Sequence, residues 1–253
     1  MPEKAGRKDI IKVAAGNDKG LDFESQESGF DVEERENLLQ QDAEEDFAYL
    51  NHQLDQGDKD WHAEAAFSSD SVQVFRKHTR GWSNVTLKTL AHLDHIPKHI
   101  VLKAIADMNL RAKWDSALGQ VEVLEHKKEQ DQTFVRLNLN KPHHMLAREA
   151  VLVRKVLKDF PQIHMNSVVL RSSPHARCPE NHRESVRVDT RMNGFILEDD
   201  ESQRGTKLKW FFQTDLKGSL PHSILTHMHL KYQQEFMAAL VKACHQIVKG
   251  NLK

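Results

Sequence analysis

Residues 205–250 read GTKLKWFFQTDLKGSLPHSILTHMHLKYQQEFMAALVKACHQIVKG, a strand pattern that passes directly into a long helix pattern. The spacing of two residues between Leu208, Trp210 and Phe212 places all three side chains on one face of a strand. Pro221 suits the start of a helix, because its missing amide hydrogen is not needed there. Apolar side chains then recur at helical spacing: Leu225, Met228, Tyr232, Phe236, Ala239, Leu240, Ala243 and Ile247. So long an apolar stripe must be buried against another element.

Shorter alternating segments precede this pair of elements. Strands are expected at 72–76, 85–93, 121–125, 133–139, 148–157, 163–170, 185–197 and 206–214. A helix beginning at Pro97 interrupts them, carrying Ile100, Val101, Ala104, Ile105 and Met108 on one face, and an acidic helix from Asp31 to about Leu54 comes first. This order predicts an α+β helix-grip fold, in which a curved antiparallel sheet surrounds the long C-terminal helix and encloses a cavity.

Composition limits where the chain can act. Residues 1–31 lack periodic hydrophobicity, so we expect a disordered tail, followed by one domain over residues 32–253. No run of eighteen apolar residues exists to span a bilayer, and the N-terminus has no apolar core of a secretory signal. Cys178 and Cys244 form neither a disulfide framework nor a metal spacing. A cytoplasmic protein that meets membranes from the aqueous side is expected.

The net charge of −1 conceals an asymmetry along the chain. Between Asp31 and Asp60, eleven acidic residues face two basic ones, a local charge of −9. Residues 1–30 carry −1, which leaves +9 on residues 61–253. A basic body favours an anionic surface, which could be a membrane or a nucleic acid, although ordinary solvated lysines explain the excess equally well.

Several groups of residues, in the right order and spacing, resemble START domains, the lipid-transfer domains related to steroidogenic acute regulatory protein. They are Arg111 with Trp114-Asp115, Ala147-Arg148-Glu149, Ser185-Val186-Arg187-Val188 with Gly194-Phe195-Ile196-Leu197, and Gly205 to Trp210. The most specific is Asp215-Leu216-Lys217-Gly218 with Leu220-Pro221 before the last helix, which is similar to the sterol-binding members. The resemblance covers about residues 32–250.

The resemblance implies a hydrophobic tunnel that holds one lipid and a protein that transfers this lipid between membranes, with a sterol slightly ahead of a phospholipid. A monomer with transient membrane contact is expected. Leu208, Trp210 and Phe212 would line the tunnel or pack against the last helix. The loop from Asn140 to Met145, together with Leu225 and Met228, would form the entrance.

Head-group candidates are few. The resemblance associates Arg111 and Asp115 with a lipid phosphate, but an Arg–Asp pair four residues apart is also a common structural pair of helices. Phosphatidylcholine is disfavoured, because a choline cage needs aromatic faces and the strand 133–139 offers only Phe134, beside the cation of Arg136.

Sterol-binding members pair a buried acid with the arginine that Arg148 matches, and here Asn138 stands in the acid's place. Asn138 could accept a hydrogen bond from Arg148 or bind a sterol hydroxyl. Alternation nevertheless puts it on the face opposite Val135, Leu137 and Leu139, so either face of this strand can line the tunnel. Arg148 could equally be a structural ion-pair residue.

Other functional classes find little support. The sixteen histidines match no metal-site spacing and are expected at the surface. No nucleophile, phosphate-loop or dinucleotide motif is present, so we expect no catalytic residue, metal or cofactor, and no nucleic-acid binding. Two alternatives stay open: a lipid-sensing regulatory or scaffold module that acts on a protein partner through the acidic helix 31–56, and an enzyme of the wider helix-grip superfamily.

Overall fold

The computed structural model describes residues 45–55, 57, 60–80, 82, 84–128, 131–140, 146–180, 185–201, 204–218 and 221–252. The expected tail, the first part of the acidic helix and residues 141–145 of the expected entrance loop, Met145 included, lie outside these ranges. Of the acidic helix, residues 45–55 are described, and they are helical.

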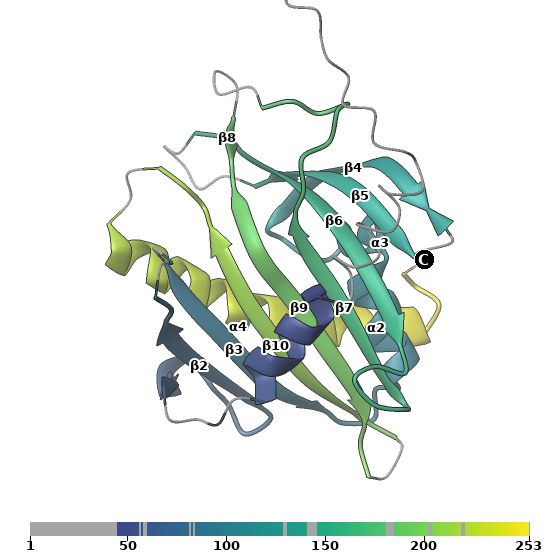
Figure 1. Cartoon of the computed structure of the whole chain (residues 1–253). Helices are drawn as coiled ribbons and strands as arrows, with labels where there is room; N and C mark the ends of the chain where they lie inside the picture. The colour runs from purple at the N-terminus through teal and green to yellow at the C-terminus, as the bar shows by residue number, and fades with distance from the viewer. Residues whose placement is uncertain are drawn as a thin grey trace, which may run out of the picture.

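Ten strands of the described ranges form one sheet (Figure 1). They are β1 (His62–Ala63), β2 (Val72–His78), β3 (Val85–Leu93), β4 (Leu118–Lys127), β5 (Gln132–Leu139), β6 (Arg148–Lys158), β7 (Met165–Ser172), β8 (Val186–Arg187), β9 (Asp189–Asp199) and β10 (Thr206–Asp215). Their order is β1-β2-β3-β10-β9-β7-β6-β5-β4, with β8 parallel beside β6 and the other pairs antiparallel. The early strand β3 therefore lies beside the last strand, β10.

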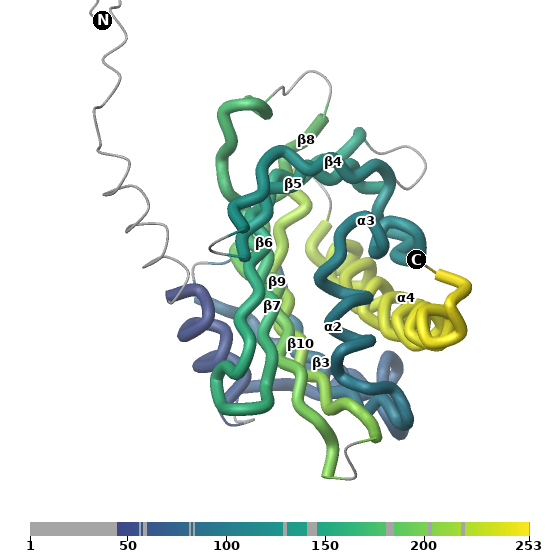
Figure 2. Tube along the Cα trace, turned by 90° about the vertical axis from the view of Figure 1, so that its right-hand side faces the viewer, coloured from purple at the N-terminus to yellow at the C-terminus, as the bar shows by residue number. Residues whose placement is uncertain are grey.

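Three helices cover one face of the sheet, which we call the inner face: α2 (Lys98–Ala106), α3 (Met108–Arg111) and α4 (His222–Val248). Figure 2 shows them together on one side of the curved sheet. The main apolar core fills the space between, and its centre is aromatic. Trp210 of β10 lies 4.3 Å from the ring of Phe236 on α4 and 5.2 Å from that of Phe195 on β9. The apolar stripe of α4 therefore packs against the inner face of the sheet, as expected for a helix-grip fold.

The helix of residues 45–55 packs on the opposite, outer face (Figure 2). Phe47, Leu50 and Leu54 are buried there against the sheet. Gly194 on β9 permits this close approach, because a Cβ atom at that position would lie 2.6 Å from Cδ1 of Leu50. Asp46 ties the described part of this helix to the sheet by binding Lys155 at 2.8 Å and Arg171 at 2.6 Å.

Two expected elements are divided in the structure. The segment 185–197 forms β8 and β9 instead of one strand, because β8 pairs with β6 whereas β9 pairs with β7. The chain changes partner at Val188, whose amide donates to the carbonyl of Glu149. The helix that begins after Pro97 ends at Ala106, and the side chain of Asp107 then caps α3 by accepting from the amide of Leu110 at 3.0 Å. β1 and the short turn of helix η2 (Ala65–Phe67) were not expected.

Candidate functional site

A cavity of about 540 Å³ lies between α4 and the inner face of the sheet. Its size falls within the ~300–1,000 Å³ typical of small-molecule sites. The wall is predominantly apolar, and strands β5, β6, β7, β9 and β10 contribute to it. Its apolar lining consists of Ala117, Leu118, Leu137, Leu139, Ala150, Leu152, Leu170, Val188, Phe212, Leu216 and Met228.

Arg111 and Asp115 form a buried ion pair beside this cavity. Nε of Arg111 donates to Oδ2 of Asp115 at 3.0 Å, and the hydroxyl of Tyr232 donates to the same oxygen at 3.1 Å. Nη2 of Arg111 donates to Tyr232 at 3.2 Å, which ties α3 to α4. Burial opposes the charge of Arg111, but Tyr232 and Asp115 outweigh it, so its pKa is raised. Arg111 and Tyr232 reach the cavity wall, and Asp115 lies behind them.

One donor of Arg111 remains unused by the described residues. Its Nη1 is buried and has no hydrogen-bond partner among them. The guanidinium group also lies over the ring of Phe236, 4.9 Å from the centroid, so this ring and the hydrogen bonds to Asp115 and Tyr232 together fix its position. A fixed, buried donor at a cavity wall can bind an oxygen atom of a ligand.

Arg148, at the start of β6, also lines the cavity. It donates to the backbone carbonyls of Leu146 at 2.8 Å, Leu216 at 3.3 Å and Lys217 at 3.2 Å. The side chain therefore holds the connection between β10 and α4, and Gly218, at φ 94°, gives it room, because a Cβ atom there would lie 3.0 Å from Nη2. Its described partners are carbonyls and not an acid.

Strand β5 faces the cavity with Leu137 and Leu139. Asn138 points to the other face, is half-buried and does not line the cavity. The same alternation places Phe134 against His175 and Arg136 against Glu149 on the outer face. Asn138 therefore lies on the wrong side of the strand to pair with Arg148 or to bind a sterol hydroxyl in the cavity, contrary to the expectation from the sequence. Phe134 and Arg136 likewise neither form nor disturb a choline cage in the cavity.

Strand β10 has the expected orientation. Leu208, Trp210 and Phe212 are buried on the inner face, and Lys209 reaches Asp55 of the helix on the outer face at 3.7 Å. Only Phe212 of the three lines the cavity. Leu208 and Trp210 belong to the packed core, where Trp210 donates from Nε1 to Oδ1 of Asn193 at 2.7 Å.

The two residues of α4 expected at the entrance differ in position. Met228 lines the cavity, whereas Leu225 is buried and does not line it. Because Met145 lies outside the described residues, the contact expected between Met145 and Met228 stays a prediction.

His229 on α4 is a functional candidate that sequence reasoning missed. The expectation of a surface histidine is wrong here, because the residue is 3% exposed and lines the cavity. Neither ring nitrogen has a hydrogen-bond partner among the described residues. Burial lowers its pKa from 6.5 to about 4, with Asp215 opposing the shift and His222 adding to it. The signal was available: His229 lies four residues after Leu225 and therefore shares its helix face.

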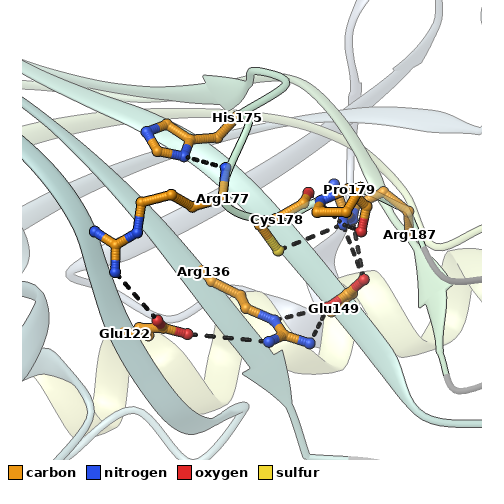
Figure 3. Close-up of polar contacts among 8 residues, drawn as sticks. All are labelled: Glu122, Arg136, Glu149, His175, Arg177, Cys178, Pro179 and Arg187. Atoms are coloured by element: carbon orange, nitrogen blue, oxygen red, sulfur yellow. Dashed lines mark hydrogen bonds and ion pairs between the residues drawn. The ribbon is translucent and has the colours of Figure 1, made fainter.

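On the outer face, the buried carboxylate of Glu149 lies in a network of polar contacts (Figure 3). Glu149, 2% exposed, accepts from Nε of Arg136 at 2.9 Å and from Nη2 of Arg187 at 2.9 Å. Burial alone would raise the pKa of Glu149, but the hydrogen bonds from these arginines and from Ser185 outweigh it, and the pKa is lowered. This network holds β5, β6 and β8 together, away from the cavity.

The described ranges contain no group of three or more acidic, histidine or cysteine side chains that could hold a metal ion. Among the same residues, no helix is sufficiently long and apolar to cross a bilayer. Cys178 and Cys244 are both buried and free.

Comparison with known proteins agrees with this architecture. Among solved structures, human StAR-related lipid transfer protein 5 is 20% identical, with a TM-score of 0.72 over 83% of this chain and 99% of that one. Human STARD10 is 17% identical, with a TM-score of 0.71 over 81% of this chain and 80% of its own. The lipid transfer and protein localization domain of human StarD13 is 21% identical, with a TM-score of 0.56 over 82% and 93%.

These structural likenesses show a shared fold. No curated protein matches the sequence. The family model described as START domain matches residues 41–250, which is most of the chain. With the curved antiparallel sheet, the long C-terminal helix and this match together, the chain belongs to the START domain family.

Proposed function

We propose that the chain binds one lipid molecule in the cavity and carries it between membranes, with a sterol favoured over a phospholipid. The observation that carries this proposal is the predominantly apolar cavity between α4 and the sheet. A lipid that leaves a bilayer loses about 0.8 kcal/mol for each CH₂ group exposed to water, and an apolar wall prevents this loss. The resemblance to lipid transfer proteins in fold and family supports the same activity.

The size of the cavity favours a compact ligand. Its volume is about 540 Å³. One ring system or one chain matches this space better than the two long chains of a phospholipid. Arg111, Arg148 and His229 place polar groups at the wall, so a ligand oxygen is expected to lie near one of them.

The proposal also covers where the protein acts, its oligomeric state and its partners. The protein would act in the cytoplasm as a monomer, touch membranes transiently and bind no nucleic acid. It would require no cofactor, and it would release its ligand chemically unchanged. Asp46 of the acidic helix already binds Lys155 and Arg171, so this part of the helix has a role within the domain.

The proposal is tested by measuring the transfer of labelled cholesterol and labelled phosphatidylcholine between vesicles, together with mass spectrometry of lipid bound to the purified chain. Ala150→Phe fills the cavity from β6, where Ala150 is 2% exposed and lines the wall. Ala48→Phe adds the same ring at an exposed position of the outer helix and is the matched control. We expect the first variant to lose at least tenfold in binding and transfer, and the control to lose neither.

Each part of the proposal can fail separately. A wild-type chain that binds neither lipid would overturn it entirely. Binding without transfer would instead identify a lipid-regulated module. Conversion of the bound lipid into a product would identify an enzyme.

A further inference from the structure

We infer that His229 recognises a free hydroxyl group of the bound lipid, so that the cavity selects lipid alcohols over their ethers and esters. This inference rests on the proposed lipid-binding function and adds the chemical class of the ligand and the residue that reads it.

His229 lines the cavity and carries two ring nitrogens without a hydrogen-bond partner among the described residues. The residue is 3% exposed. Its ring packs edge-on against Phe212, with the centroids 5.3 Å apart and the planes at 74°, which fixes its orientation. Buried polar atoms without partners are rare in folded proteins, because each costs free energy. A hydroxyl group of a ligand in the cavity would supply such a partner.

The chemistry of the ring defines what can pair with it. Burial lowers the pKa of His229 to about 4, so the imidazole is neutral near pH 7 and offers one donor and one acceptor. A hydroxyl group also has one donor and can accept, so it satisfies whichever ring nitrogen it meets. An ether or ester oxygen can only accept, and a neutral imidazole gives no charge to a phosphate.

The Arg111–Asp115 pair beside His229 does not require an anionic ligand. Arg111, which also faces the cavity, is balanced by Asp115 at 3.0 Å. Tyr232, which bonds to this pair, lies on α4 as His229 does. The ring centroids of Tyr232 and His229 lie 5.9 Å and 5.3 Å from that of Phe212, so His229 is close to the pair. The Arg111–Asp115 pair therefore adds hydrogen-bonding atoms but no net charge to this wall.

Sterols and diacylglycerols both carry a free hydroxyl group, and the cavity volume favours the more compact sterol. The experiment therefore compares four lipids in neutral vesicles: cholesterol, cholesterol methyl ether, diacylglycerol and phosphatidylcholine. The variants are His229→Leu, which removes both nitrogens, and His229→Gln, which keeps a donor and an acceptor. His245→Leu, at an exposed position near the end of α4, is the matched control.

We expect the wild type and His245→Leu to bind cholesterol about tenfold more tightly than the methyl ether. His229→Leu should bind both equally, and His229→Gln should recover part of the preference. The lipid-free His229→Leu protein should unfold at the same or a higher temperature than the wild type, because it buries no unpaired polar group. A residue that served only the fold would give the opposite shift.

Three outcomes separate this inference from the proposed function. If His229→Leu keeps the preference for cholesterol, the inference is overturned while lipid binding stands. If diacylglycerol shows the dependence on His229 and cholesterol is not bound, hydroxyl recognition stands and the sterol part of the proposed function falls. If the wild type binds none of the four lipids, both are overturned.

Discussion

On the outer face of the sheet, the buried carboxylate of Glu149 accepts hydrogen bonds from Arg136 and Arg187. On the inner face, both ring nitrogens of His229 and Nη1 of Arg111 are buried without a partner among the described residues. The sheet is the same, and both sets of groups are removed from water. The outer groups have partners from adjacent strands, whereas the inner groups face a cavity. The outer network therefore stabilises the fold, whereas the unpaired inner groups support the ligand site proposed above.

The largest effect is expected where the inner face is fully packed. Trp210 is completely buried between Phe195 and Phe236, and Trp210→Ala should lower the free energy of unfolding by about 3–5 kcal/mol. Urea denaturation followed by circular dichroism measures this loss. Phe212→Ala, at the cavity wall, should cost less, because its ring already borders empty space. Equal losses would mean that the cavity wall is as tightly packed as the core.

The unpaired inner histidine should make stability depend on pH. The pKa of His229 is about 4 in the folded protein and 6.5 in the unfolded chain, so between these values the unfolded chain binds the proton first. Its contribution is therefore complete above pH 6.5 and falls as the pH decreases. At pH 4.5 the loss should be about 2–3 kcal/mol, from ~1.4 kcal/mol for each pKa unit.

Other groups titrate in the same range, so the prediction concerns a difference between two proteins. Wild type and His229→Leu are compared by urea denaturation at pH 7 and pH 4.5. The variant should lose about 2–3 kcal/mol less than the wild type over this interval. Parallel losses in the two proteins would show that His229 is protonated in the folded state as easily as in the unfolded one.

Removing a charge from the outer network should lower the stability of the fold and leave lipid binding unchanged. Glu149→Gln leaves two arginines without their carboxylate, and Arg187 is 13% exposed at its side chain. Breaking a buried ion pair costs about 3–5 kcal/mol, and we expect about 2 kcal/mol here, because the side chain of Arg136 is 37% exposed. Glu201→Gln, at a carboxylate 95% exposed, is the control and should change stability little. Cholesterol binding by the folded Glu149→Gln protein should equal that of the wild type, and a loss of binding would contradict the division between the two faces.

The sequence predicted features that depend on periodicity. Alternation in β10 correctly placed Trp210 inward and Lys209 outward, because the two faces of a strand are set by its period of two. Partners that approach through the tertiary fold could not be predicted in this way. Arg148 binds carbonyls of Leu216 and Lys217, which no local pattern relates to it. His229 was missed because its residue type favours the surface, although its spacing from Leu225 placed it on the buried face.

Residue patterns also do not show where the backbone of one element must approach another closely. Gly194, where β9 meets the helix on the outer face, allows a test of one such contact, with the smallest effect expected. Gly194→Ala would place a Cβ atom 2.6 Å from Cδ1 and 2.8 Å from Cδ2 of Leu50. Leu50 is fully buried and cannot move aside freely, so the variant should lose about 1–2 kcal/mol through overpacking. Urea denaturation of Gly194→Ala, Leu50→Ala and the double variant separates this clash from other effects. In the Leu50→Ala background the added methyl group has room, so Gly194→Ala should cost less than in the wild type. Additive losses would show that the helix of residues 45–55 does not depend on this contact for its place on the sheet.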